Sequence, residues 1–268
     1  MARRHDADAG GDPDVLAAKA RVREAVWDRM SVKGIARFPS PRNRIPNFVG
    51  AEIAAQRLAE TDEWRAARTV KSNPDSPQLP VRMQALEDGK LVYMAVPRLA
   101  EPDPFLVLDP AALADPPRRA ATITGAVRSA RRVALDDMAP VDLVVTGCVA
   151  VTEAGERLGK GGGFSDLELA LAATVGLVDR DTVVVTTVHD VQVHPAGSVP
   201  TTAHDVHVDV VVTPTRVIRC PRPRGHRLPE LRWSELTDEK VDAIPLLSRM
   251  RDERARGSRS RSSRRRRG

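Results

Sequence analysis

The stretch VDLVVTGCVAVTEAGERLGKGGGFSDLELALAATVG, residues 141–176, decides the fold. It opens with a run rich in β-branched residues, which is typical of a buried strand. A short turn, a glycine-rich loop and a helical pattern follow in that order. Ser165 and Glu168 have the spacing of a capping box, which predicts that the helix begins at Ser165. The stretch therefore predicts a strand, a loop and a helix in succession.

The glycine-rich loop is a candidate anion site. Its backbone N–H groups can approach a ligand closely, and the helix that follows adds its positive N-terminal end. Arg157 and Lys160 supply positive charge beside it. The spacing is not that of a P-loop, and Phe164 stands where a dinucleotide fingerprint needs its last glycine. From spacing alone, anion binding and a plain tight turn both stay open. The loop glycines are Gly159, Gly161, Gly162 and Gly163.

Similar strand and helix signals occur on both sides of this stretch. Amphipathic periodicity predicts helices over residues 14–30 and 51–60. Short β-branched runs predict strands, with helical patterns between several of them. This alternation predicts an α/β fold of three layers, a mostly parallel sheet flanked by helices in a single domain. The predicted strands cover residues 91–96, 141–151, 182–188 and 208–213.

Composition limits the classes of protein that fit. The net charge of +6 comes from residues 249–268, whose ten arginines against one Asp and one Glu give +8 and leave about −2 for the rest. We expect disorder in residues 1–12 and in the 249–268 tail, with the folded domain at residues 13–248. The tail could contact RNA or other polyanions weakly. No apolar run of membrane-spanning length or secretory signal is present, which predicts a soluble, cytoplasmic protein.

Two further groups of residues could serve a site. Lys19 and Arg23 are four residues apart and share one face of the first helix, which could equally be a solvated surface. Strand alternation in residues 204–210 places Asp205, His207 and Asp209 on one face, and this predicts convergent carboxylates. Such oxygen ligands suit magnesium better than zinc, although zinc bound by two histidines and a polar strand end remain open.

At these three places together, the sequence resembles the 5-formyltetrahydrofolate cyclo-ligase (methenyltetrahydrofolate synthetase) family. The family's K-x-x-x-R helix is matched by Lys19 and Arg23, and its H-D-x-x-x-D strand by His204, Asp205 and Asp209. Three motifs in the right order, within residues 14–220, make the resemblance specific. Its R-x-G-x-G-x-G-aromatic-x-D loop is matched by Arg157, Gly159, Gly161, Gly163, Phe164 and Asp166.

The resemblance implies a cyclo-ligase fold of the NagB/RpiA-like type and an ATP-dependent enzyme of one-carbon metabolism that acts on folate. Lys19 and Arg23 would bind the ATP phosphates, and Asp166 with Asp205 would hold Mg²⁺. Arg157, Lys160 and Asp166 would be the catalytic residues. Arg157 and the glycine amides would stabilise charge that develops on the transferred phosphoryl group, and Asp166 would act through the metal ion. The phosphates would also contact the loop through Gly159, Gly161, Gly162, Gly163, Phe164 and Ser165.

Within the family, the chain is most similar to the methenyltetrahydrofolate synthetase domain-containing proteins, through segments such as RIPNFVGAE and KSNPDSPQ. Cyclo-ligases usually have two tyrosines before the loop aspartate, whereas this chain has Phe164 and Ser165. Two alternatives therefore stay beside a folate cyclo-ligase. One is an ATP-binding relative with another substrate, for example in thiamine or other cofactor salvage. The other is a non-catalytic domain whose tail binds RNA or another polyanion.

Overall fold

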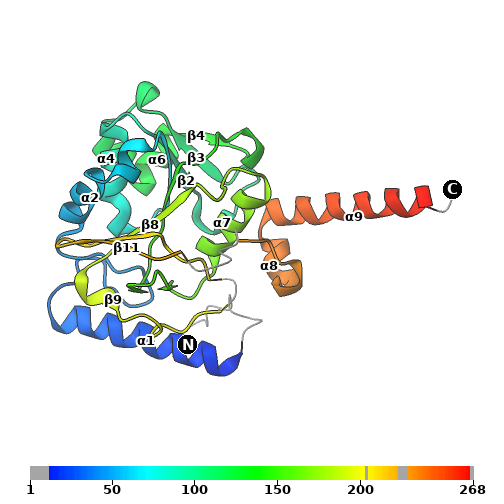
Figure 1. Cartoon of the computed structure of the whole chain (residues 1–268). Coiled ribbons are helices and arrows are strands. Elements are labelled where there is room, and N and C mark those ends of the chain that lie inside the picture. Colours follow the sequence, from blue (N-terminus) through cyan, green and yellow to red (C-terminus); the bar gives the residue numbers. More distant parts are fainter. Residues whose placement is uncertain (1–11, 203–204, 223–228, 266–268) are drawn as a thin grey trace.

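The protein is a three-layer α/β structure, seen here in a computed structural model (Figure 1). The structure describes residues 12–202, 205–222 and 229–265. Its main sheet has eight strands, of which the five central ones are parallel and the outer three are antiparallel to their neighbours. The strand order is β11 (Val217–Arg219), β10 (Val210–Val212), β8 (Val183–Thr187), β5 (Leu143–Val145), β1 (Thr69–Ser72), β2 (Leu91–Ala95), β3 (Phe105–Leu108) and β4 (Arg131–Val133). The predicted fold class is confirmed.

Five short helices cover one face of this sheet (Figure 1). Strand side chains alternate between the two faces, so Val70 packs under these helices while its neighbour Lys71 points to the opposite face. Trp64 and Leu58 fill the space between sheet and helices. The five are α2 (Ala51–Ala59), α3 (Asp62–Ala66), α4 (Leu79–Glu87), α5 (Pro117–Ala120) and α6 (Ile123–Ser129).

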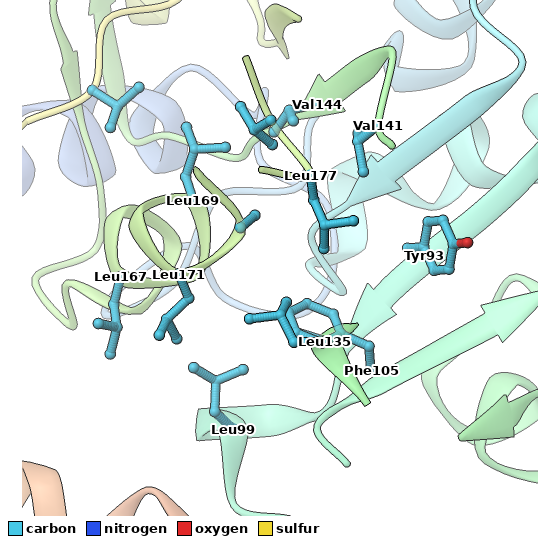
Figure 2. Close-up of a cluster of buried hydrophobic side chains, with 14 of the residues drawn as sticks. Tyr93, Leu99, Phe105, Leu135, Val141, Val144, Leu167, Leu169, Leu171 and Leu177 are labelled. Atoms are coloured by element: carbon cyan, nitrogen blue, oxygen red, sulfur yellow. The ribbon is translucent and has the colours of Figure 1, made fainter. Parts of the chain in front are cut away.

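Helix α7 (Phe164–Thr174) packs on the opposite face and is hydrophobic almost all round. Figure 2 shows Leu167, Leu169 and Leu171 projecting from this helix, with Leu171 on the side toward Leu135 and Phe105. Helix α8 (Asp238–Ala243) and the first turns of α9 (Pro245–Arg265) extend the same cluster. A helix buried on most of its surface needs no strong amphipathic pattern. Its place in the core fixes where its N-terminal end lies.

A second, three-stranded sheet joins the first helix to the body. Its order is β7 (Arg157–Leu158), β6 (Ala150–Thr152) and β9 (Val193–His194), with β6 antiparallel to β7 and parallel to β9. Helix α1 (Pro13–Val32) packs on it through Val26, Trp27 and Met30. The helices predicted at residues 14–30 and 51–60 are therefore confirmed as α1 and α2.

The single strand predicted at residues 141–151 is wrong, because the chain divides into β5 and β6 in different sheets. The break falls at Gly147, where a Cβ atom would lie 2.8 Å from Ile45 Cγ2. After this point the carbonyls of Cys148 and Val149 accept hydrogen bonds from the side chain of Gln192, at 3.2 and 3.1 Å. The Gln192 side chain thus satisfies carbonyls that would bond to a neighbouring strand if the strand were continuous.

Helix α9 runs through residues for which the sequence predicts disorder. Leu246 and Leu247 are buried in the core, and Arg251 pairs with Asp242 at 2.9 Å. Arginine, glutamate and alanine are good helix formers, which favours continuation of the helix through residues 251–256 beyond these contacts. Figure 1 shows α9 extending away from the body of the molecule. Residues 1–11, on which most of the other predicted disordered segment falls, lie outside the described residues.

The order of the strands places a site at one edge of the sheet. The chain enters the sheet at β1, adds β2 on one side and later adds β5 on the other side. A crevice forms where parallel strands diverge in this way, outside their carboxyl ends. Asn73 follows β1 and Thr146 follows β5. The backbone N–H of Asn73 donates to the Val145 carbonyl at 3.1 Å. The crevice therefore lies between these two strand ends.

No helix in the described part of the chain is long and apolar enough to span a membrane. Both cysteines, Cys148 and Cys220, are free thiols. Burial raises the pKa of Cys148 to about 11, and burial together with nearby Asp209 raises that of Cys220 to about 11. Both thiols are therefore protonated near neutral pH and are poor nucleophiles.

Candidate functional site

A cavity of about 400 Å³ lies at the crevice between β1 and β5. One wall is the loop after β1, residues 73–76, and the other is the glycine-rich loop with the start of α7. Gly147 forms part of its base, and Ile45, Val96 and Phe164 add apolar surface. The size is that of a small-molecule site. The glycine loop and α7 contribute Arg157, Gly159, Lys160, Gly162, Gly163, Phe164, Ser165, Asp166 and Glu168 to the lining.

The glycine loop ends in an uncapped helix N-terminus. Gly163 is the N-cap of α7, with a φ of 62° in the left-handed region, and no side chain caps the first turn. The predicted capping box is wrong, because α7 begins one residue before Ser165. The Ser165 hydroxyl instead contacts Thr146 Oγ1 at 2.8 Å and accepts a hydrogen bond from the side-chain Nδ2 of Asn73 at 3.1 Å. The first-turn amides of a helix of this length can thus bind an anion.

Arg157 stands beside these amides with little exposure to solvent. Its side chain is 2% exposed, and Nη2 forms an ion pair with Asp166 Oδ1. The Nε atom is buried and has no hydrogen-bond partner among the described residues. A buried donor without a partner is costly, which indicates that water or a ligand oxygen satisfies it. Burial also makes the charge of Arg157 more effective toward an anion in the cavity.

The structure brings Arg23 of α1 to the glycine loop and Lys19 to Asp205, and neither residue lines the cavity. Arg23 Nε donates to the Gly159 carbonyl at 2.8 Å. Its guanidinium also lies against Gly161, where a Cβ atom would approach it to 3.4 Å. Lys19 is buried and contacts Asp205 Oδ2 at 2.6 Å. In this conformation Arg23 holds the glycine loop and Lys19 holds the segment that contains Asp205.

The predicted convergence of carboxylates on one strand face is wrong. Residues 205–208 are not part of β10, which begins at Val210. Asp209 accepts from the Val184 amide at 2.8 Å and from Arg222 at 2.7 Å, whereas Asp205 contacts Lys19 and Thr202. Val206, Val208 and Val210 do face the core as alternation predicts. His204 lies outside the described residues.

Asp166 and Asp205, the predicted metal ligands, belong to adjacent segments. Asp166 Oδ1 accepts from the Val206 amide at 3.1 Å, directly after Asp205 in the chain. Each carboxylate already uses one oxygen for a cation, Arg157 or Lys19. No group of three or more His, Cys, Asp or Glu side chains within the described ranges is placed to hold a metal ion by itself.

Sequence analysis missed the residues that shape the other wall. Arg82 of α4 is 1% exposed and donates to the carbonyls of Asn73 at 2.5 Å and Asp75 at 3.2 Å. Burial lowers its pKa to about 10, so it keeps its charge at neutral pH. Lys160 of the opposite wall contacts Asp75 Oδ1 at 2.9 Å across the cavity. The sequence signal that could have identified Arg82 is an arginine on the inner, otherwise apolar face of a predicted helix.

Lys71 and Glu168 form a second unforeseen feature, a buried ion pair behind the cavity wall. Their side chains are 3% and 7% exposed, and Lys71 Nζ also donates to Asn73 Oδ1 at 3.1 Å. They come from β1 and α7, 97 residues apart in the sequence. Taken together, the cavity offers cations and free amides on one side and a hydrogen-bonded polar surface on the other. It is suited to bind a phosphorylated ligand beside a polar organic group.

Comparison with known proteins identifies the family. A sequence model of the 5-formyltetrahydrofolate cyclo-ligase family matches residues 16–214, which is more than half of the chain. A methenyltetrahydrofolate synthase domain-containing protein of Bos taurus is 40% identical over 245 residues, and its counterpart in Mus musculus is 41% identical over 240 residues. These alignments cover 90% and 88% of this chain and 63% of each relative, so the chain spans less than two thirds of their length.

Among solved structures, the 5,10-methenyltetrahydrofolate synthetase of Aquifex aeolicus aligns with 78% of this chain and 96% of its own, at 21% identity and a TM-score of 0.48. The resemblance inferred from the three sequence motifs is confirmed by the family match and by the two mammalian relatives. The chain belongs to the 5-formyltetrahydrofolate cyclo-ligase family.

Proposed function

We propose that the protein is an ATP- and Mg²⁺-dependent 5-formyltetrahydrofolate cyclo-ligase that forms 5,10-methenyltetrahydrofolate. The observation that carries this proposal is the phosphate-binding end of the cavity, where buried Arg157 stands beside the uncapped N-terminus of α7. Family membership supports the choice of reaction. We place the catalytic unit in residues 13–248 and treat residues 249–268 as an appendage.

The reaction needs charge stabilisation and close placement of two substrates. The formyl oxygen of the folate attacks the γ-phosphorus of ATP, and ADP leaves. The neighbouring folate nitrogen then attacks the activated formyl carbon, after which phosphate leaves and the nitrogen loses its proton. No step requires a covalent bond to the protein. This agrees with two cysteine thiols held in the protonated form by their raised pKa values.

Arg157 and the loop amides would stabilise charge on the transferred phosphoryl group. The unpartnered Nε of Arg157 is a donor that a phosphate oxygen can satisfy, and Asp166 holds the guanidinium in place. Lys160 is 45% exposed at the mouth, where it would attract the polyphosphate as a point charge. Lys19 and Arg23 would contribute to phosphate binding from α1 indirectly, Arg23 by holding the loop and Lys19 by holding Asp205.

The donor set fits a magnesium ion that is held mainly by phosphate oxygens and water. Asp166 lines the cavity and its Oδ2 has no hydrogen-bond partner among the described residues, so this oxygen is the protein ligand that we propose. Asp205 would contribute its Oδ1 in the same way, since its Oδ2 is bound by Lys19. Magnesium characteristically binds one or two carboxylates together with substrate phosphates. When bound, the ion would neutralise charge on the phosphates.

A second candidate is a paralogous ATP-dependent enzyme with a different acceptor. The observation that favours it is the polar network at Ser165, which contacts Thr146 and Asn73 where cyclo-ligases usually have tyrosine. Fold and family membership do not determine an acceptor substrate. The same phosphate end of the cavity would serve either reaction.

The absorbance of 5,10-methenyltetrahydrofolate tests the proposal, measured after the protein is mixed with 5-formyltetrahydrofolate, ATP and Mg²⁺. We expect turnover by the wild type, its loss in Arg157→Ala, and its retention in Arg219→Ala. Arg219 is the matched control, because it pairs with Glu63 at the far edge of the sheet. If the wild type binds ATP but forms no product, the folate assignment is wrong and the second candidate replaces it.

A further inference from the structure

The buried ion pair of Lys71 and Glu168 has no part in the phosphate chemistry described above. Glu168 lies one turn after the start of α7, about 6 Å along the helix from its first residue. Its carboxylate contributes to the cavity wall, and Lys71 lies behind it in the sheet. Glu168 therefore lies one helical turn beyond the glycine loop, with Lys71 behind it on the β1 side of the cavity.

A network of hydrogen bonds fixes this side of the cavity. Lys71 donates to Asn73, Asn73 donates to Ser165, and Ser165 contacts Thr146. These four residues and Glu168 come from the carboxyl ends of β1 and β5 and from the first turns of α7. Asn73, Ser165 and Glu168 line the cavity directly. Their polar atoms form one connected surface, which we call the polar floor.

Packing alone gives no reason for charges at this place. Lys71 is aligned in the sheet with Tyr93 and Val144, and both of these belong to the apolar cluster around α7. Leu167 and Leu169 flank Glu168 on the helix and are buried in that cluster. An apolar pair of similar size commonly stabilises a core as well as a buried ion pair does. A buried ion pair whose acidic member lines a cavity is therefore a candidate for ligand recognition.

We propose that Glu168 is a specificity-determining residue that accepts hydrogen bonds from the N–H groups of a flat nitrogen heterocycle, and that Lys71 positions its carboxylate. Because Lys71 balances the charge of Glu168, a neutral N–H donor suits this side of the cavity better than a second cation. Ile45, Val96 and Phe164 supply the apolar surface that a flat ring needs.

The inference deepens the proposed function, since it rests on the acceptor occupying the same cavity. It assigns the two sides of that cavity to different parts of the reaction. The phosphate end binds the polyphosphate, and the polar floor selects the ring system of the acceptor. A purely structural role for the pair, holding β1 against α7, predicts instead that all ligands respond equally to its removal.

Binding measurements on the full chain distinguish these two roles. The probes are 2-aminopyrimidin-4-one, which carries N–H donors, unsubstituted pyrimidine, which carries none, 5-formyltetrahydrofolate and a non-hydrolysable ATP analogue. The test variant is Lys71→Met with Glu168→Leu, which removes both charges together and leaves neither unpaired. Glu168→Gln is the second variant, because it keeps an acceptor oxygen and serves if the double variant does not fold.

We expect the wild type to bind the aminopyrimidinone and not pyrimidine. The double variant should bind the aminopyrimidinone and 5-formyltetrahydrofolate at least tenfold more weakly, with ATP-analogue affinity changed less than twofold. Glu168→Gln should give an intermediate loss. Binding of the aminopyrimidinone without any cyclo-ligase product would support the inference and contradict only the folate reaction.

Two results would overturn the inference. One is a wild type that binds neither 2-aminopyrimidin-4-one nor 5-formyltetrahydrofolate. The other is a double variant that binds both probes as tightly as the wild type. That result would contradict the inference about Glu168 but not the proposed cyclo-ligase function. An equal loss of acceptor and nucleotide affinity would assign the pair to the structural role and would also contradict the inference.

Discussion

The two walls of the cavity are built in opposite ways. In the loop after β1, Arg82 lies behind the backbone and donates hydrogen bonds to the carbonyls of Asn73, Pro74 and Asp75. In the glycine loop, Arg23 contacts the Gly159 carbonyl from behind, and the first amides of α7 have no side-chain cap. The first wall is a buried anchor that belongs to the core, and the second is a set of donors facing the cavity.

This difference separates stability from function. The charge of Arg82 is fully used by protein carbonyls, so removing it leaves buried polar groups without partners. Arg157 still has a donor to give, so the cost of removing it should be largest when a ligand oxygen is present. We therefore expect changes in the first wall to lower the free energy of unfolding and changes in the second to lower turnover.

The largest effect is expected for Arg82→Met. The change removes a buried charge and leaves the carbonyls of Asn73, Asp75 and Ala121 without their donor. We expect a loss of about 3–5 kcal/mol in the free energy of unfolding, measured by chemical denaturation. Arg37→Met is the matched control, because Arg37 forms an exposed pair with Glu52 and should cost about 1 kcal/mol or less. Similar losses in both variants would contradict the anchor role.

Arg157→Lys comes next and acts on the opposite wall. Lysine keeps the positive charge but lacks the planar donors that Arg157 presents to Asp166 and to the cavity. We expect the turnover number for methenyltetrahydrofolate formation to fall about 10²- to 10³-fold. Product absorbance gives the rate, and a thermal melt shows whether the fold survives. A variant with near wild-type turnover would mean that charge alone is needed at this position.

Gly161→Ala should have a smaller effect, which again falls partly on stability and partly on ligand binding. Gly161 has a φ of 102°, and its added methyl group would approach the Arg23 guanidinium to 3.4 Å. We expect a loss of about 1 kcal/mol in stability from the backbone conformation, together with about tenfold weaker ATP binding measured by calorimetry. Gly176→Ala is the control, because φ there is 76° and nothing lies within 4 Å of the added atom. Equal ATP affinities in the two variants would exclude a phosphate role for the loop conformation.

The two walls also differ in how far sequence reasoning reached them. The glycine loop, Arg157 and Lys160 lie within one short segment, so local spacing was enough to predict a site there. Arg82 and Lys71 act through partners that are remote or on the backbone, and a sequence pattern carries no sign of such pairs. Most of the fold was predictable from local sequence in the same way, because helices and strands follow local periodicity.

Two of the errors share one physical cause, which is that tertiary contacts decided between two locally acceptable conformations. Ser165 and Glu168 have the spacing of a cap, but Thr146 and Lys71 bind them and Gly163 takes the cap position. The run at residues 141–151 reads as one strand, but Ile45 lies close to Gly147 and the Gln192 side chain binds the carbonyls of Cys148 and Val149. In both cases the competing partner comes from a distant part of the chain.

The smallest effect is expected where the two walls meet. Lys160 and Asp75 join the walls at 2.9 Å, but the lysine side chain is 45% exposed, and an exposed pair of this kind contributes about 1 kcal/mol or less. A double-mutant cycle with Lys160→Ala and Asp75→Asn should give a coupling of that size in the free energy of unfolding, and 1 M salt should reduce it. A coupling above about 2 kcal/mol that resists salt would mean that one rigid unit forms both walls.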